Sequence, residues 1–242
     1  MGVIRTLSIG DIHGKDVWKQ ATDGTIHHID DFDKVIFVGD YVDSFHVPAV
    51  IQKRNLLDII EFKKSYPDKV INLLGNHDVQ YMHFPQYRCS GFQAPHAIDY
   101  TQIFRENREL FQLAYQIGNH LWSHAGVHRG WYNECCKKYH EGHPGISLAA
   151  VLNHDYERNN HWIYSVGYLR GGSSDTGGPL WLDRRNLWKK PLTDYHQIVG
   201  HTRITDGKGF KHNAEYRGDT SVTCIDLLED ESPQFYIKEV DE

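Results

Sequence analysis

The stretch that decides the fold is Lys34-Val-Ile-Phe-Val-Gly-Asp-Tyr-Val-Asp43. Its first half, residues 34–38, is short, β-branched and apolar, which predicts a strand buried on both faces. Its second half begins with a glycine, which lets the backbone turn sharply and approach closely. The stretch therefore predicts a buried strand that delivers two carboxylates, Asp40 and Asp43, just beyond its end.

The same design occurs twice more in the first third of the chain. Val3 to Ile9 runs into Gly-Asp-Ile-His-Gly, and Lys69 to Leu74 runs into Gly-Asn-His-Asp. An apolar pattern from Val47 to Tyr66 suits an amphipathic helix that Pro67 ends. Strand, helix and strand in this order indicate a parallel sheet, whose ligands bind at the carboxyl ends of the strands.

The rest of the chain predicts further α/β structure without a repeat or a linker, so we expect a single domain over residues 1–242. Two helical excursions are expected, at about 79–118 and 130–165. The last two predicted strands resemble antiparallel edge strands, which favours a second, mixed sheet. The expected elements are a helix from Thr101 to Tyr115, a loop from Arg170 to Pro179, and strands at Leu121–Ser123, His196–Val199, Ser221–Leu227 and Gln234–Val240.

Composition excludes some classes of function. The 242 residues carry 26 basic and 32 acidic side chains, a net charge of −6, which argues against binding duplex nucleic acid by phosphate neutralisation. The four cysteines contain no C-x-x-C pair, and we interpret them as reduced thiols. With no signal-peptide pattern and no apolar run of membrane-spanning length, we expect a cytoplasmic protein without a membrane partner.

Potential metal ligands follow the predicted strands in order. Carboxylate, imidazole and amide oxygen together suit divalent manganese, iron or zinc. A lone Asp-x-His pair is common by chance, but a series of such elements, all at strand ends, is not. The candidate ligands are Asp11, His13, Asp40, Asn76, His124 and His201.

These motifs resemble the metallophosphoesterase (calcineurin-like) superfamily. The similarity lies in Gly-Asp-Ile-His-Gly, Gly-Asp-Tyr-Val-Asp, Gly-Asn-His-Asp, Ser-His-Ala-Gly and Gly-His-Thr, spread over residues 10–202. It is greatest for the phosphoprotein-phosphatase branch, with its bacterial and phage serine/threonine protein phosphatases. The resemblance implies an α/β fold of two packed mixed β-sheets flanked by α-helices.

The resemblance also implies two divalent ions, with manganese expected in vitro and iron or zinc as alternatives. Asp11 and His13 would bind the first ion, Asp40 would bridge both, and Asn76, His124 and His201 would complete the second. A metal-bridging hydroxide would then attack a phosphate ester.

The resemblance further implies a proton donor for the leaving group. His77 would be this acid, and Asp43 would orient it. Asp78 is a rival for the orienting role, but it is equally well interpreted as a helix-capping or supporting residue.

The chain departs from the family pattern at the positions that bind the substrate phosphate. Ser44 and Leu74 stand where the protein phosphatases carry arginines, Phe45 replaces a glycine and Asp78 replaces a glutamate. Serine and leucine cannot replace the bidentate guanidinium contact.

Another cation should therefore contact the phosphate. We expect it to be Arg170, together with the amide of Asn76, while Arg203 and Arg88 are weaker candidates.

Three functions remain open on these grounds. The first is hydrolysis of phosphate monoesters, with a phosphoprotein or a small phosphate ester as the substrate. The second is hydrolysis of dinucleoside polyphosphates or phosphodiesters. The third is a non-catalytic phosphate-binding scaffold, which the complete ligand set makes the weakest of the three.

Overall fold

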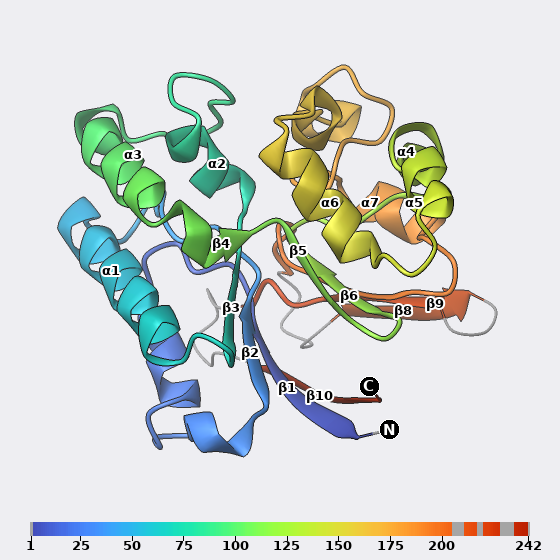
Figure 1. Ribbon diagram of the computed structural model, residues 1–242. Coiled ribbons are helices and arrows are strands. Elements are labelled where there is room, and N and C mark those ends of the chain that lie inside the picture. The colour runs from blue at the N-terminus through green and yellow to red at the C-terminus, as the bar shows by residue number, and fades with distance from the viewer. Residues whose placement is uncertain (1, 205–210, 217–219, 228–234, 242) are drawn as a thin grey trace. The chain divides into compact units, whose positions relative to one another are not determined.

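The computed structural model describes residues 2–204, 211–216, 220–227 and 235–241. The chain forms two compact units, one of residues 1–112 with 227–242 and the other of residues 113–226. Each unit contains one five-stranded sheet with helices beside it (Figure 1). The two mixed sheets with their helices confirm the predicted α/β class. The prediction of a single domain stays a prediction.

The first unit has a mostly parallel sheet with the strand order β10-β1-β2-β3-β4. Strands β1 to β4 are parallel, and β10 is antiparallel to β1 at one edge. The short strands β2 and β3 are almost completely buried, as continuous apolar strands require. The strands are β1 (Val3–Ile9), β2 (Lys34–Phe37), β3 (Val70–Leu73), β4 (Phe111–Gln112) and β10 (Tyr236–Asp241).

The helices of the first unit are α1 (Ala49–Ser65), α2 (Asn76–Met82) and α3 (Ala97–Glu106). Figure 1 shows α1 and α3 side by side, and the ion pair between Lys53 and Asp99 joins them at 2.7 Å. Helix α1 exists as predicted, but Val50 and Leu57 on it are exposed. Its buried face includes polar Gln52 and Asn55, because both have hydrogen-bond partners inside the unit.

The second unit has the strand order β5-β6-β7-β9-β8. Its three inner strands are parallel, and the two edge strands are antiparallel to their neighbours. The strands are β5 (Ala114–Ile117), β6 (His120–Ser123), β7 (His196–Val199), β8 (Lys211–Tyr216) and β9 (Thr220–Cys224). Figure 1 shows the helices over one face of this sheet: α4 (Arg129–Cys135), α5 (Lys137–Gly142), α6 (Leu148–Glu157) and α7 (Arg184–Lys189).

Short 3-10 helices connect these elements. Two of them lie in the second unit. His161–Tyr164 precedes the glycine-rich loop of residues 170–179, and Tyr168–Arg170 ends where this loop begins. The others are at Val17–Ala21, Ile29–Asp31, Ala94–His96 and Arg108–Leu110.

Two of the predicted elements are wrong. The helix expected from Thr101 to Tyr115 ends at Glu106, and residues 111–117 form strands instead. Apolar residues at 111, 113, 114 and 117 fit both the helical and the strand periodicity. The turn at Gly118 and Asn119 allows β5 to pair with β6, and this pairing favours the strand. The late strand β9 is an inner strand parallel to β7, not an edge strand, which agrees with the complete burial of its five residues.

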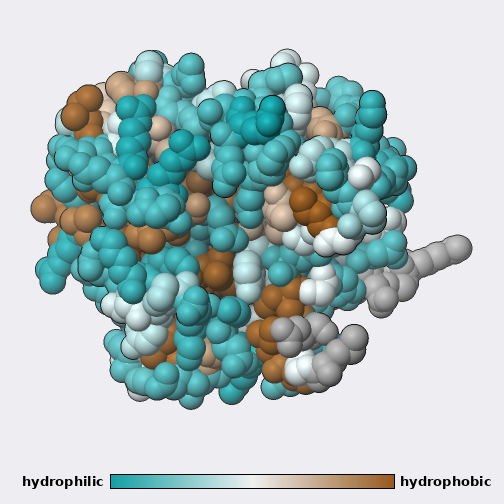
Figure 2. All heavy atoms as spheres, in the orientation of Figure 1, coloured by the Kyte–Doolittle hydropathy of each residue, from teal (hydrophilic) through white to brown (hydrophobic). Residues whose placement is uncertain are grey.

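The surface in view in Figure 2 is mainly hydrophilic, with apolar side chains in small groups. No helix in the described ranges is long and apolar enough to cross a membrane.

Candidate metal and catalytic site

The loops after β1 and β2 are joined backbone to backbone, which fixes the candidate ligands they carry. The His13 amide donates to the Asp40 carbonyl at 2.7 Å, and the Gly14 amide donates to the Tyr41 carbonyl at 2.9 Å. The carboxyl ends of parallel strands meet at one edge of a sheet, so these loops lie where ligands bind.

Glycine allows the loops after β2 and β3 to approach each other. A Cβ atom at Gly75 would lie 2.1 Å from Asp40 Oδ1, and one at Gly39 would lie 2.4 Å from the Gly75 amide nitrogen. Gly39 also has a φ of +102°, which residues with a side chain rarely adopt. The two glycines therefore let the Asp40 carboxylate sit directly against the start of α2.

Backbone strain is concentrated at the candidate residues. Seven non-glycine residues in the described ranges have positive φ, and four of them are His13, Asp40, Asp43 and His201. Such conformations cost about 1–3 kcal/mol each and persist where function requires them. The strain therefore points to the same residues as the sequence motifs do.

The first unit holds a group that suits a divalent cation. One potential ligand atom each from Asp11, His13 and Asp40 lies within 4.8 Å of the others. His13 Nδ1 is 2.8 Å from the Val42 carbonyl, an acceptor only, so Nδ1 carries the proton and Nε2 is the nitrogen that could coordinate a cation. Nε2 lies 3.8 Å from Asp40 Oδ2. Two carboxylates and an oriented imidazole fit manganese, iron or zinc.

Asn76 opens helix α2, next to this group in sequence, and is 2% exposed. Its side-chain Nδ2 contacts Cys89 Sγ at 3.7 Å. A buried amide whose nitrogen is engaged presents its oxygen as the atom suited to a cation or a phosphate donor.

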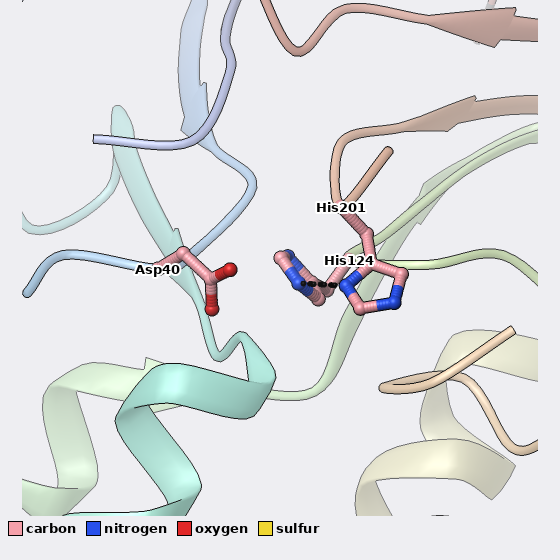
Figure 3. A group of neighbouring side chains, drawn as sticks. All are labelled: Asp40, His124 and His201. Carbon is pink, nitrogen blue, oxygen red and sulfur yellow. Dashed lines mark hydrogen bonds between the residues drawn. The ribbon is translucent and has the colours of Figure 1, made fainter. Parts of the chain in front are cut away.

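The second unit brings together the remaining two candidate ligands. His124 follows β6 and His201 follows β7, and these two strands are parallel neighbours. His124 Nε2 lies 3.1 Å from His201 Nδ1 (Figure 3). Two nitrogens that coordinate the same ion with tetrahedral geometry stand about 3.3 Å apart. The pair therefore fits joint ligation of one ion.

His77, which is partly buried, and Asp43, which is buried, form a hydrogen-bonded pair. His77 Nδ1 lies 3.0 Å from Asp43 Oδ2, and the side chains are 13% and 0% exposed. Burial by itself lowers the pKa of His77, but the Asp40 charge and the Asp43 hydrogen bond outweigh it, so the pKa is raised well above its usual value. Cations bound at Asp40 would offset part of that rise.

Asp78 accepts hydrogen bonds from backbone amides, which fits the supporting role. Its side chain is completely buried. Its oxygens accept hydrogen bonds from the amides of Asp40 (2.8 Å), Tyr41 (2.9 Å) and Gly75 (2.8 Å). Asp78 thus ties the loop after β2 to the start of α2.

Asp78→Ala should lower the free energy of unfolding by about 3 kcal/mol or more, because three buried amides lose their acceptor. Asp78→Asn should cost less, since its amide oxygen can still accept. Urea unfolding measures both effects, with the exposed Asp99→Ala as a control that should change little. A loss no larger than that of the control would contradict this role.

Ser44 and Leu74, which stand where the protein phosphatases carry arginines, have structural roles. Ser44 Oγ accepts from the amides of His46 and Val47 at 3.2 and 3.0 Å, which forms the turn before α1. Leu74 is completely buried at the end of β3. The neighbouring Phe45 is 77% exposed.

Arg170 lies against the residue that follows His201. Its guanidinium Nη2 donates to Thr202 Oγ1 and reaches the His201 carbonyl at 3.5 Å. Its Nε is 3.1 Å from Asp183 Oδ2, a charge contact without the angle of a hydrogen bond. By contrast, Arg88 stacks over Phe92 and Arg203 is exposed.

Sequence reasoning missed the residues that surround the Asp43–His77 pair. Gln80 and Tyr81 both donate to Asp43, and they follow His77 by three and four positions on α2, the spacing that shares a helix face. That spacing could have identified them. Cys89, 3.7 Å from His77 Nδ1, comes from the irregular segment after α2 and carried no sequence signal.

Comparison with known proteins identifies the family. No curated protein sequence matches the chain. Among the solved structures similar to the chain is a cold-active protein-tyrosine phosphatase from a psychrophilic Shewanella species (15% identity, TM-score 0.54, covering 93% of this chain and 71% of that one). Another is a protein serine/threonine phosphatase from Saccharomyces cerevisiae (14% identity, TM-score 0.50, covering 99% of this chain and 80% of that one). The model of the calcineurin-like phosphoesterase family matches residues 4–237. The chain therefore belongs to the calcineurin-like phosphoesterase family.

Proposed function

We propose that this metal-dependent phosphoesterase hydrolyses phosphate monoesters of alcohols, with phosphoserine and phosphothreonine side chains as the model substrates. Two divalent ions, manganese in vitro, would be held by Asp11, His13, Asp40, Asn76, His124 and His201. Bound ions would polarise the phosphoryl oxygens and lower the pKa of the attacking water.

The observation that supports this substrate class is the Asp43–His77 pair. An alkoxide is a poor leaving group, so its departure needs a proton, whereas a phosphate released from an anhydride does not. The raised pKa of His77 favours the protonated imidazole, the form that a general acid needs. Asp43 accepts from Nδ1, which leaves Nε2 as the nitrogen that would protonate the leaving oxygen.

A substrate panel tests the proposal. Manganese-loaded protein is assayed with a phosphoserine peptide, p-nitrophenyl phosphate, bis-p-nitrophenyl phosphate and diadenosine tetraphosphate, each with and without a chelator. We expect the monoesters to be preferred and the activity to disappear on chelation. Preference for diadenosine tetraphosphate or for the bis ester would indicate the alternative classes, and turnover by the chelated protein would contradict metal dependence.

We assign Arg170 to the phosphate contact that Ser44 and Leu74 cannot make. Arg170→Ala should lower kcat/KM by about ten- to 150-fold, the worth of a charge-assisted hydrogen bond. Arg170→Lys should recover only part, because lysine lacks the planar fork. Metal content should stay normal, since no ligand is changed.

The contact with Asp183 supplies the control for this prediction. Asp183→Asn retains the helix-capping oxygen that accepts from the Arg185 amide but removes the charge facing Arg170. It should affect kcat/KM less than Arg170→Ala does. Equal kcat/KM for Arg170→Ala and the wild type would show that the guanidinium serves only to fix the loop to Thr202.

A cytoplasmic location remains part of the proposal. We interpret the four cysteines as reduced thiols, which the cytoplasm would maintain.

A further inference from the structure

A second group of metal-ligating atoms lies in the first unit, beside the candidate ligands and distinct from them. One potential ligand atom each from Asp43, His77 and Cys89 lies within 4.8 Å of the others. Nδ1 of His77 is 3.0 Å from Asp43 Oδ2 and 3.7 Å from Cys89 Sγ. The Asp43 carboxylate and the Cys89 thiol therefore both lie next to His77 Nδ1.

The spacing of these atoms is close to that of a zinc site. With bonds of about 2.0–2.3 Å, ligand atoms on a tetrahedral zinc ion stand about 3.4–3.6 Å apart. The nitrogen–oxygen distance is a few tenths of an ångström shorter than this, and the nitrogen–sulfur distance is slightly longer. Small side-chain rotations would accommodate the ion, with water as the fourth ligand.

Neighbouring side chains hold the three ligands in place. Gln80 Nε2 donates to Asp43 Oδ2, while Gln80 Oε1 accepts from the Cys89 amide at 3.1 Å. Tyr81 donates its hydroxyl to Asp43 Oδ1 at 2.5 Å, and burial together with the Asp43 charge raises the pKa of Tyr81, so it remains the donor. Each carboxylate oxygen has a second lone pair, so zinc could bind Oδ2 without displacing Gln80. Such supporting hydrogen bonds typically accompany metal ligands.

The donor set selects the metal. A thiolate binds zinc in preference to manganese, which favours oxygen ligands. The six ligands assigned to the hydrolytic ions include no sulfur. His77 and Cys89 are partly exposed, so an ion from solution can reach the group.

We propose that Asp43, His77 and Cys89 form an inhibitory zinc site. Binding releases the Cys89 thiol proton and the proton on His77 Nδ1 to solvent, and the ion takes their place. The imidazole then carries a proton on Nε2 only and is a neutral, much weaker acid. This consequence for catalysis rests on the proposed function of His77, whereas the binding itself does not.

Cobalt(II), a spectroscopic substitute for zinc, tests the binding. Titrated into manganese-loaded protein, it should give a thiolate-to-cobalt charge-transfer band that saturates at one equivalent and is removed by zinc. The band should be absent from Cys89→Ser and Cys89→Ala and unchanged in Cys135→Ser. A missing band, or a band that survives both Cys89 substitutions, would overturn the site whether or not the protein is a monoesterase.

Kinetics test the inhibition. Zinc at saturation should slow hydrolysis of an alkyl phosphate by about 10²–10⁴-fold, the worth of a general acid, and slow p-nitrophenyl phosphate much less. Cys89→Ser and Cys89→Ala should need a higher zinc concentration than the wild type for the same fractional inhibition. The inhibition of each variant is measured against its own zinc-free rate. Equal inhibition of both substrates, unchanged by the Cys89 substitutions, would place the inhibitory ion elsewhere.

Discussion

Asp40→Asn should be the most damaging substitution of a candidate ligand, lowering both turnover and metal content. Removal of a contact that merely supports a ligand costs about 10–100-fold, so loss of a bridging carboxylate should exceed about 100-fold. The change keeps the shape of the side chain. Its Oδ1 can still accept from the His77 amide, a bond of 2.9 Å in the structure, so the effect measures the charge.

Metal analysis and kinetics on the same preparation check this prediction. His13→Ala changes a ligand of one ion only, so it should lose less metal than Asp40→Asn does. Asp99→Asn, on the exposed side of α3, should have normal metal content and rate. If Asp40→Asn retained nearly normal metal content and turnover, Asp40 would not be a bridging ligand.

The sequence predicted the strands that carry the site because their signal is local. Residues 3–9 form β1 as expected, and β2 and β3 differ from their predicted ranges by a single residue at one or both ends. A buried apolar run followed by glycine needs no information from elsewhere in the chain. The order of the motifs then placed Asp11, Asp40 and Asn76 at the ends of parallel strands, where the structure has them.

Features that depend on distant contacts were not predictable in this way. The role of Asp78 depends on where the amides of Asp40 and Tyr41 lie, nearly forty positions earlier. Cys89 reaches His77 through an irregular segment whose path no periodic pattern describes. Residues 111–117 satisfied both helical and strand periods, and the hairpin with β6 determined the outcome.

His77→Ala should slow hydrolysis of alkyl phosphates by about 10²–10⁴-fold, the usual contribution of a general acid. The loss should be much smaller for p-nitrophenyl phosphate, whose leaving group needs little protonation. Manganese content should be unchanged, because the His77 ring contacts Asp43 and Cys89 and is not one of the six ligands assigned to the hydrolytic ions. Equal losses on the two substrates would contradict the assignment.

Asp43→Asn separates the charge of the pair from its geometry. An asparagine oxygen can still accept from His77 Nδ1, so the ring keeps its orientation. Asp43 helps to raise the pKa of His77, and its neutralisation should therefore lower that pKa. The protonated acid would then be lost at a lower pH, and the alkaline limb of the rate profile for an alkyl phosphate should shift to lower pH. The profile for p-nitrophenyl phosphate should shift less, and an unshifted alkyl-phosphate profile would show that Asp43 does not tune the acid.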